Sequence, residues 1–169
     1  MLKKFNGLMP KVNDTCYISD NAMLWGEVIL HSNIGIFDYA VLRADFGPIE
    51  IGSCSNVQEN VSIHNDIDFP VKIGSSVTIG HGAIIHGCTI EDRVVIGMGA
   101  IILNGVKISH DCIIGAGSLL CEGMYVPPYS VVVGSPAKVI KTISDYQIKY
   151  IENNANEYVK LTSLYLKGE

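Results

Sequence analysis

Charged side chains are scarce in this sequence. Of the 169 residues, 17% are Asp, Glu, Lys or Arg, against roughly 25% in an ordinary soluble domain. This balance excludes a disordered chain, because disordered chains are rich in charge and poor in apolar residues. Arginine occurs only twice, no basic cluster is present, and the formal net charge is −5. A nucleic-acid partner is therefore not expected, since phosphate backbones bind to positive surfaces.

Long apolar runs and paired cysteines are also missing. The longest aliphatic stretch without a charge, around Val94 to Leu103, is half of the ~20 residues that a membrane-spanning helix needs, so no membrane partner is expected. The first residues, Met1 to Pro10, do not have the apolar run of a secretory signal. The cysteines are scattered and form no CxxC pair, which is typical of reduced thiols and predicts a cytoplasmic protein.

Isoleucine, valine and glycine are abundant instead, and the aliphatic residues recur every six positions. Neither the spacing of an amphipathic helix nor the strict alternation of an ordinary strand fits this period. One large inward position in every six residues predicts an all-β fold, a parallel β-helix whose hexads each form a short strand and a corner. The alternative, a β-sandwich, would place its turns at irregular intervals of roughly eight to twelve residues. The series comprises Ile18, Leu24, Leu30, Ile36, Leu42, Ile51, Val57, Ile63, Ile73, Ile79, Ile85, Ile90, Ile96, Ile102, Ile108, Ile114, Leu120, Val126 and Val132.

Two smaller classes of residue accompany the series. A small or β-branched residue stands four places after the aliphatic one, as at Val77, Ala83 and Thr89. Glycine often follows the aliphatic residue directly, as at Gly74 and Gly97, where it is expected to turn corners that β-branched residues would strain.

The six-residue period is interrupted three times. Three residues are inserted between Leu42 and Ile51, four between Ile63 and Ile73, and one is deleted between Ile85 and Ile90. Insertions in a solenoid form surface loops, often beside a binding site. The second insertion carries Asp66 and Asp68, which are expected to form a solvated turn.

The period fades towards the C-terminus, which predicts a β-helix domain over 1–140 and a helical segment over 141–169. Ser144 or Asp145 is expected to cap the helix, which would cover the coils or a neighbouring subunit. Exposed ladder edges and apolar faces of the solenoid also favour self-association. The apolar stripe of the predicted helix comprises Ile148, Ile151, Ala155, Tyr158, Val159, Thr162 and Tyr165.

Two of the five histidines share a position in the repeat. His64 and His86 each follow an aliphatic residue directly, and the 22 residues between them equal three hexads plus the four-residue insertion. If three hexads make one coil, the two imidazoles stack on one corner about 4.8 Å apart. Arg43 falls in the same column by the same arithmetic.

His81 lies near a different corner, so it would reach that pair only from a neighbouring chain across a threefold axis. Three neutral imidazoles with an open fourth position make a catalytic zinc geometry. The spacing therefore predicts both a bound metal and a trimer. His31 and His110 are expected to be ordinary corner residues, and Cys88 a small buried filler and not a fourth ligand.

An ordered set of motifs resembles the γ-class carbonic anhydrase family in its compact bacterial branch, over nearly the whole chain. The resemblance implies a left-handed β-helix of triangular section that assembles as a homotrimer with three metal sites at its subunit interfaces. The motifs are Leu42-Arg43-Ala44-Asp45, Asn56-Val57-Gln58-Glu59-Asn60, Ile63-His64, Thr78-Ile79-Gly80-His81-Gly82-Ala83, His86-Gly87-Cys88-Thr89-Ile90 and Ile96-Gly97-Met98-Gly99-Ala100.

The resemblance also implies metal ligands and a reaction. His64 and His86 would bind the metal from one subunit and His81 from the next. The metal would be zinc, with iron or cobalt as alternatives. The implied reaction is the reversible hydration of CO2 to bicarbonate by a metal-bound hydroxide.

Six further residues would surround the metal in this family. Arg43 would pair with Asp45 and, across the interface, with the acidic residue at Glu59. Gln58 and Asn56 would orient the metal-bound water. Tyr158 would reach the site from the final helix.

Two departures from the family pattern leave other functions open. Phe46 stands where archetypal members carry glutamate, and the loop with Asp66 and Asp68 is short, so regeneration of hydroxide is predicted to be slow. Glu59 replaces the usual aspartate and keeps the charge. One alternative is a CoA-dependent acyltransferase with His81 or His110 as general base. The other is a metal-binding trimeric scaffold with little catalysis.

Overall fold

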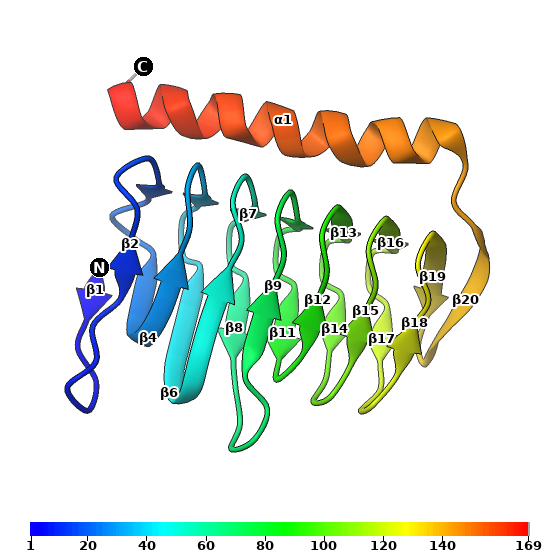
Figure 1. Ribbon diagram of the computed structural model, residues 1–169, viewed down its shortest axis with the longest axis horizontal. Coiled ribbons are helices and arrows are strands. Elements are labelled where there is room, and N and C mark those ends of the chain that lie inside the picture. Colours follow the sequence, from blue (N-terminus) through cyan, green and yellow to red (C-terminus); the bar gives the residue numbers. More distant parts are fainter. Residues whose placement is uncertain (169) are drawn as a thin grey trace.

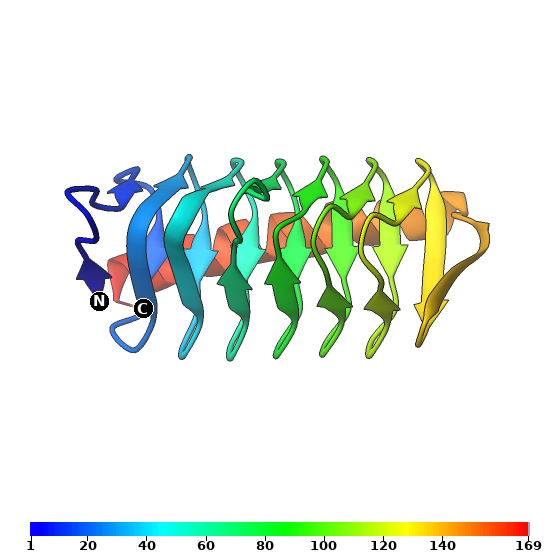
Figure 2. The same cartoon turned by 90° about the horizontal axis from the view of Figure 1, so that it is seen from below.

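The computed structural model describes residues 1–168 and shows a left-handed parallel β-helix of about seven turns with one C-terminal helix (Figure 1). The expected fold class is confirmed. Successive turns stack along the long axis, and the helix runs beside them along the same axis. The view from below shows the strands of successive turns side by side, with the helix behind them (Figure 2).

Three parallel ladders make the faces of the solenoid. Two faces belong to one twelve-stranded sheet, because β4 (Met23–Leu30) and β6 (Val41–Ile51) are long enough to take part in both. The other strands of this sheet are β1 (Leu2–Lys3), β2 (Lys11–Val12), β8 (Ser62–His64), β9 (Val71–Ile73), β11 (Ile84–His86), β12 (Thr89–Ile90), β14 (Ile101–Ile102), β15 (Lys107–Ile108), β17 (Leu119–Leu120) and β18 (Tyr125–Val126).

The third face is an eight-stranded sheet that ends in one antiparallel pair. Its last strand, β20, returns along β19 and closes that end of the ladder, which reduces the exposed edge. The strands are β3 (Tyr17–Ile18), β5 (Gly35–Ile36), β7 (Asn56–Val57), β10 (Thr78–Ile79), β13 (Val94–Ile96), β16 (Cys112–Ile114), β19 (Ser130–Gly134) and β20 (Ala137–Thr142).

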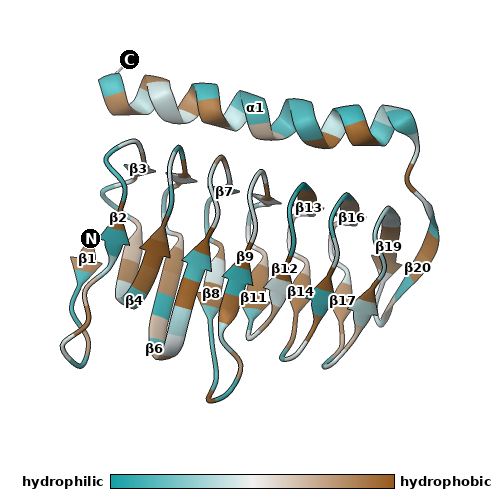
Figure 3. Cartoon of the chain, viewed as in Figure 1, coloured by the Kyte–Doolittle hydropathy of each residue, from teal (hydrophilic) through white to brown (hydrophobic). Residues whose placement is uncertain are grey.

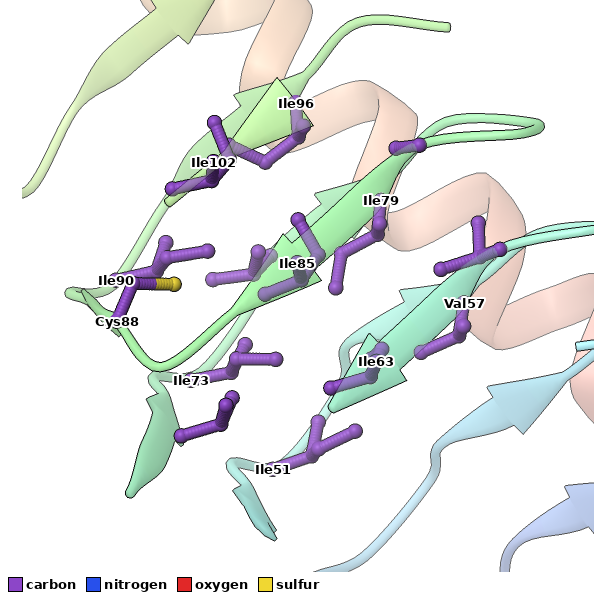
Figure 4. Packing of buried hydrophobic residues seen from close by; sticks show 14 of the residues in the cluster. Ile51, Val57, Ile63, Ile73, Ile79, Ile85, Cys88, Ile90, Ile96 and Ile102 are labelled. Carbon is purple, nitrogen blue, oxygen red and sulfur yellow. The ribbon is translucent and has the colours of Figure 1, made fainter. Parts of the chain in front are cut away.

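The core is the aliphatic series that the six-residue period predicts. Every member except Ile18 is buried, and the side chains of successive turns, such as Ile63, Ile85 and Ile102, point into the interior (Figure 4). Each fully buried Ile contributes about 1.5–3 kcal/mol of transfer free energy. Ile18 stays half-buried because its strand β3 lies at the sheet edge and pairs only with β5.

Two positions show how the repeat is packed. Cys88 is 2% exposed, as expected for a small buried filler; it takes the inward position that the one-residue deletion shifts away from Thr89. Burial raises the pKa of the Cys88 thiol to about 12. Gly97 does not have a positive φ; instead a Cβ there would overlap the backbone of Ala116 in the next coil, so close stacking requires this glycine.

The two insertions lie at the surface, next to each other in the stack. The first lengthens β6, whose pairing with β4 shifts register between Gly26 and Val28. The second forms a tight turn closed by backbone hydrogen bonds between Asp66 and Phe69. Both Asp66 and Asp68 are exposed, as expected for a solvated turn.

The helix α1 (Asp145–Lys167) begins with a capping box, in which the side chain of Ser144 and that of Gln147 each accept from the other residue's backbone N–H. Ile151, Ala155 and Thr162 are buried against the solenoid of the same chain, and hydrophilic and hydrophobic bands alternate along the helix (Figure 3). The strand β20 runs across residue 140, where the sequence analysis divides the chain. Within residues 1–168, no helix is long and apolar enough to cross a membrane.

Candidate metal centre

Arg43, His64 and His86 form one column on the outer surface. β6, β8 and β11 pair in parallel so that Arg43 lies opposite His64 and His64 opposite His86. This is the register that the spacing predicts. The centroids of the two imidazole rings are 5.0 Å apart. The side chains face outward because alternate residues of a strand point to opposite faces and Ile63 and Ile85 fill the core.

Asp45 fixes the tautomer of His64. Its Oδ1 lies 2.8 Å from Nε2 of His64, and its Oδ2 accepts from the Arg43 guanidinium. Burial opposes ionisation of Asp45, but the His64 hydrogen bond and the Arg43 charge together hold its pKa below the usual value. An ionised carboxylate only accepts hydrogen bonds. His64 therefore carries its proton on Nε2 and has a lone pair on Nδ1, which Arg43 Nη2 approaches to 3.4 Å.

Asn104 plays the same part for His86. Its Oδ1 lies 2.7 Å from Nδ1 of His86, so Nδ1 donates and Nε2 keeps a lone pair. The two lone-pair nitrogens, Nδ1 of His64 and Nε2 of His86, are 3.0 Å apart. Two acceptors at this distance repel each other unless a cation lies beside them. Two nitrogen ligands on one tetrahedral zinc would be about 3.3 Å apart, so this pair fits a shared metal ion.

Asn104 is not among the site residues that the sequence predicts. Because Ile85 pairs with Ile102, the next position of the column falls on Leu103, and Asn104 lies one residue beyond it, so coil arithmetic alone does not identify this partner. Gly87 makes room for the contact, because a Cβ at Gly87 would overlap the side-chain oxygen of Asn104, and its φ of +53° is one that L residues rarely adopt.

His81 lies at another corner, in the turn after β10. Its Nδ1 is 2.6 Å from Oε2 of Glu59, so Nε2 is the ring nitrogen that remains available to a metal. The His81 side chain is 47% exposed. No group of three His, Cys, Asp or Glu residues within positions 1–168 of one chain can hold a metal ion. A site with His81 as third ligand therefore needs a second chain.

A groove of about 230 Å³ lies between His81 and helix α1, and Gln58, Tyr158 and Asn154 line it. Gln58 is 5% exposed; its Oε1 accepts from the His81 backbone N–H at 3.2 Å and its Nε2 donates to Asn56 Oδ1 at 3.2 Å. Burial raises the pKa of the Tyr158 hydroxyl, and its ring packs edge-on against Phe37 at 5.6 Å. Helix α1 thus brings Tyr158 beside Gln58 and His81.

The remaining residues singled out from the sequence lie around the column or at another corner. Phe46 is 53% exposed, with its ring 5.8 Å from that of His64. His31 bonds Glu50 at 2.9 Å. His110 Nδ1 donates to Asp111 Oδ2 at 2.7 Å, and Asp111 also accepts two hydrogen bonds from Arg93. His31 and His110 both lie at strand-ending corners, as expected.

Comparisons with family models identify the repeat. Residues 70–104 match the model described as bacterial transferase hexapeptide (six repeats), and residues 89–122 match the hexapeptide repeat of succinyl-transferase.

Comparisons with whole proteins extend over most of the chain. A Methanocaldococcus jannaschii protein named "probable carbonic anhydrase" is 43% identical over 86% of this chain and 91% of its own length. The mitochondrial gamma carbonic anhydrase 2 of Arabidopsis thaliana is 35% identical over 92% of this chain, which spans 58% of the plant protein's length. A crystal structure from Bacillus cereus, provisionally described as an acetyltransferase, is 33% identical, covers 99% of this chain and 98% of its own, and superposes with a TM-score of 0.98.

Proposed function

Because the chain belongs to the γ-class carbonic anhydrase-like family of hexapeptide-repeat proteins, we propose that it catalyses the reversible hydration of CO2 to bicarbonate. The catalytic metal would be held by His64 and His86 of one chain and His81 of the next, in a homotrimer. The observation that carries this proposal is the pair of ring nitrogens 3.0 Å apart, each left with a lone pair because the other nitrogen of its ring is hydrogen-bonded.

Each of the three histidines has a partner on one ring nitrogen. Asp45 and Asn104 are within hydrogen-bond distance of His64 and His86, and Glu59 forms an ion-pair contact with His81. In each case the other nitrogen would be available to a metal. A divalent metal held by three neutral imidazoles lowers the pKa of a water that it binds to about 7. Imidazole ligands suit zinc, iron and cobalt alike; we propose zinc, with iron or cobalt as alternatives.

The other residues of the site have roles that fit CO2 and bicarbonate. Gln58 has one amide N–H beyond the two contacts described above, and this donor would orient the reacting water. The Arg43 guanidinium lies beside His64 and would attract the bicarbonate anion. The Tyr158 hydroxyl is protonated at neutral pH, as an ordinary tyrosine is, and burial raises its pKa further, so it can donate a hydrogen bond in the groove.

The assembly is supported by a mostly apolar row, interrupted by one serine, on the face that carries the column. Val41, Ser62, Ile84, Ile101 and Leu119 lie in register across the strands β6, β8, β11, β14 and β17. Ile84 is 42% exposed because it points away from the core. This row lies two residues from Arg43, His64 and His86, so a second chain that delivered His81 would also cover it. Such a head-to-tail contact between different surfaces would close into a ring of three if each contact rotated the chain by about 120°.

An acyltransferase is the second candidate, because the hexapeptide family models and the Bacillus cereus structure carry transferase names. Such an enzyme would use one histidine as general base. It would not require the lone pairs of His64 and His86 to face each other. A metal-binding scaffold with little turnover is the third candidate, since the exposed Phe46 ring lies against His64.

Elemental analysis and stopped-flow kinetics test these readings. Protein purified in zinc-supplemented buffer should hold about one metal per chain and accelerate CO2 hydration, and His64→Ala should lose both properties. His31→Ala is the matched control, because His31 lies at another corner. Full metal occupancy without any rate above buffer would favour the scaffold. Saturable acetyl-CoA binding by calorimetry, without bound metal, would favour the acyltransferase.

A further inference from the structure

A chain of buried side-chain hydrogen bonds joins helix α1 to the candidate site. Thr78 Oγ1 lies 2.7 Å from Asn154 Oδ1, Asn56 Nδ2 lies 2.9 Å from Thr78 Oγ1, and Gln58 Nε2 lies 3.2 Å from Asn56 Oδ1. Asn56 is fully buried, and Thr78 and Gln58 are 3% and 5% exposed. Polar groups buried to this extent strongly favour the arrangement in which every partner is satisfied.

The direction of this chain is determined from its end at His81. The backbone N–H of His81 can only donate, so the atom of Gln58 that faces it must be the oxygen. The Gln58 nitrogen then faces Asn56, which must present its own oxygen there and its nitrogen to Thr78. Thr78 Oγ1 accepts that bond, so its hydroxyl proton goes to Asn154. Reversing any one amide would place two donors or two acceptors together.

Asn154 is held in place by the packing of the helix. Ile151 and Ala155 on either side of it are buried, and near the C-terminal end the ring of Tyr165 stacks on Tyr17 with centroids 4.8 Å apart. Asn154 therefore presents its oxygen to Thr78 from a fixed position.

We propose that Asn154 and Thr78 are positioning residues, which hold Asn56, and through it the Gln58 amide, in the one orientation that also satisfies the His81 backbone N–H. Helix α1 thereby becomes part of the site without touching the metal ligands. This inference rests on the proposed function only for the role of Gln58 in turnover. The orientation of the Gln58 amide is a separate property that can be measured without metal.

Two pairs of variants test the chain. Thr78→Val removes the hydroxyl that both accepts and donates, whereas Thr78→Ser keeps it. Asn154→Leu removes the terminal acceptor, whereas Asn154→Asp keeps an acceptor and nothing in the chain requires a donor there. Asn153→Leu, at the exposed neighbouring position of the helix, controls for a change in the helix itself.

The direct measurement is the pair of Gln58 side-chain amide signals in the 1H–15N spectrum of metal-free protein, assigned by their loss in Gln58→Glu. Thr78→Val and Asn154→Leu should move both signals towards solvent-exposed values, whereas Thr78→Ser, Asn154→Asp and Asn153→Leu should leave them in place. In metal-loaded protein, kcat for CO2 hydration should fall about tenfold in the first two variants, the effect of about one hydrogen bond. Metal content and KM should be unchanged.

Unchanged Gln58 signals and unchanged kcat in Asn154→Leu would overturn the inference, as would Thr78→Ser behaving like Thr78→Val. Asn154 is only half-buried, so its substitution should be tolerated better than that of the buried Thr78, and this variant is informative even if Thr78→Val does not fold. If the wild-type protein does not hydrate CO2, the proposed function fails, and the amide signals still decide whether the chain exists.

Discussion

Nδ1 of His64 lies 3.0 Å from Nε2 of His86, and in the neutral tautomers that the Asp45 and Asn104 contacts favour, neither nitrogen carries a hydrogen to donate to the other. The contact arises because β8 and β11 are neighbours in register, and because Asp45 and Asn104 occupy the remaining nitrogens. A pair of this kind is stabilised by a cation between or beside the rings. The site geometry thus depends as much on the two hydrogen-bonding partners as on the histidines.

Asn104 should therefore tune metal affinity. Asn104→Ala frees Nδ1 of His86 and allows its ring to rotate, so zinc affinity should fall about 10–100-fold, as is usual for the loss of such a partner. Asn104→Asp keeps an acceptor and should bind zinc nearly as the wild type does. Competition with a chromophoric chelator measures both constants. Equal affinity in the alanine variant and the wild type would show that Asn104 does not orient His86.

The aliphatic ladder predicts a sharp contrast between two isoleucines. Ile85 is fully buried in the interior, so Ile85→Ala should destabilise the protein by about 2–5 kcal/mol through lost burial and a residual cavity. Ile67 is 64% exposed in the inserted turn, so Ile67→Ala should change stability by less than about 0.5 kcal/mol. Urea denaturation followed by circular dichroism compares the two; similar losses would contradict the inward assignment of the series.

Much of this fold could be predicted from the sequence, because a solenoid repeats one local rule. The six-residue period identifies the buried series, and counting coils places His64 under His86. Where one residue is deleted, the small inward position shifts by one, from Thr89 to Cys88. The repeat predicts that glycines are needed at corners, but it does not give the reason at each one. At Gly97 the reason is close contact with the next coil and not a positive φ.

The side-chain network around the site could not be predicted in the same way. The hydrogen bond from Thr78 to Asn154 spans 76 residues, and it depends on how far helix α1 slides along the solenoid. No period in the sequence sets that distance. The metal column follows from backbone register alone, whereas the groove at Tyr158 follows from the packing of the helix.

Stability should depend on pH through Asp111. The Arg93 hydrogen bonds are the largest influence and lower the pKa of Asp111; burial opposes them, and the His110 contact adds to them. A depressed folded pKa contributes stability that is fully present above the unfolded value of about 3.9 and is lost as pH falls through the folded value. The midpoint temperature of thermal unfolding should therefore decrease once the pH falls below about 4.

Asp111→Asn tests this assignment. At pH 7 the variant should lose about 1–3 kcal/mol, because Arg93 loses a charged acceptor, and its midpoint should fall less steeply between pH 4 and pH 2. Asp68→Asn, in the exposed turn, should keep the wild-type profile. If the unfolding midpoint of Asp111→Asn fell with pH as steeply as that of the wild type, Asp111 would not be the source of the acid sensitivity.

The central claim, that each metal site is shared between two chains, is tested most directly by mixing two inactive variants. His81→Ala and His86→Ala, refolded together in equal amounts, should regain about one quarter of wild-type zinc content and CO2 hydration, since one in four random head-to-tail contacts then carries all three ligands. His64→Ala mixed with His86→Ala should regain nothing, because both ligands come from the same chain. If the mixture of His81→Ala and His86→Ala bound no more zinc than either variant alone, the result would contradict a site shared between two chains.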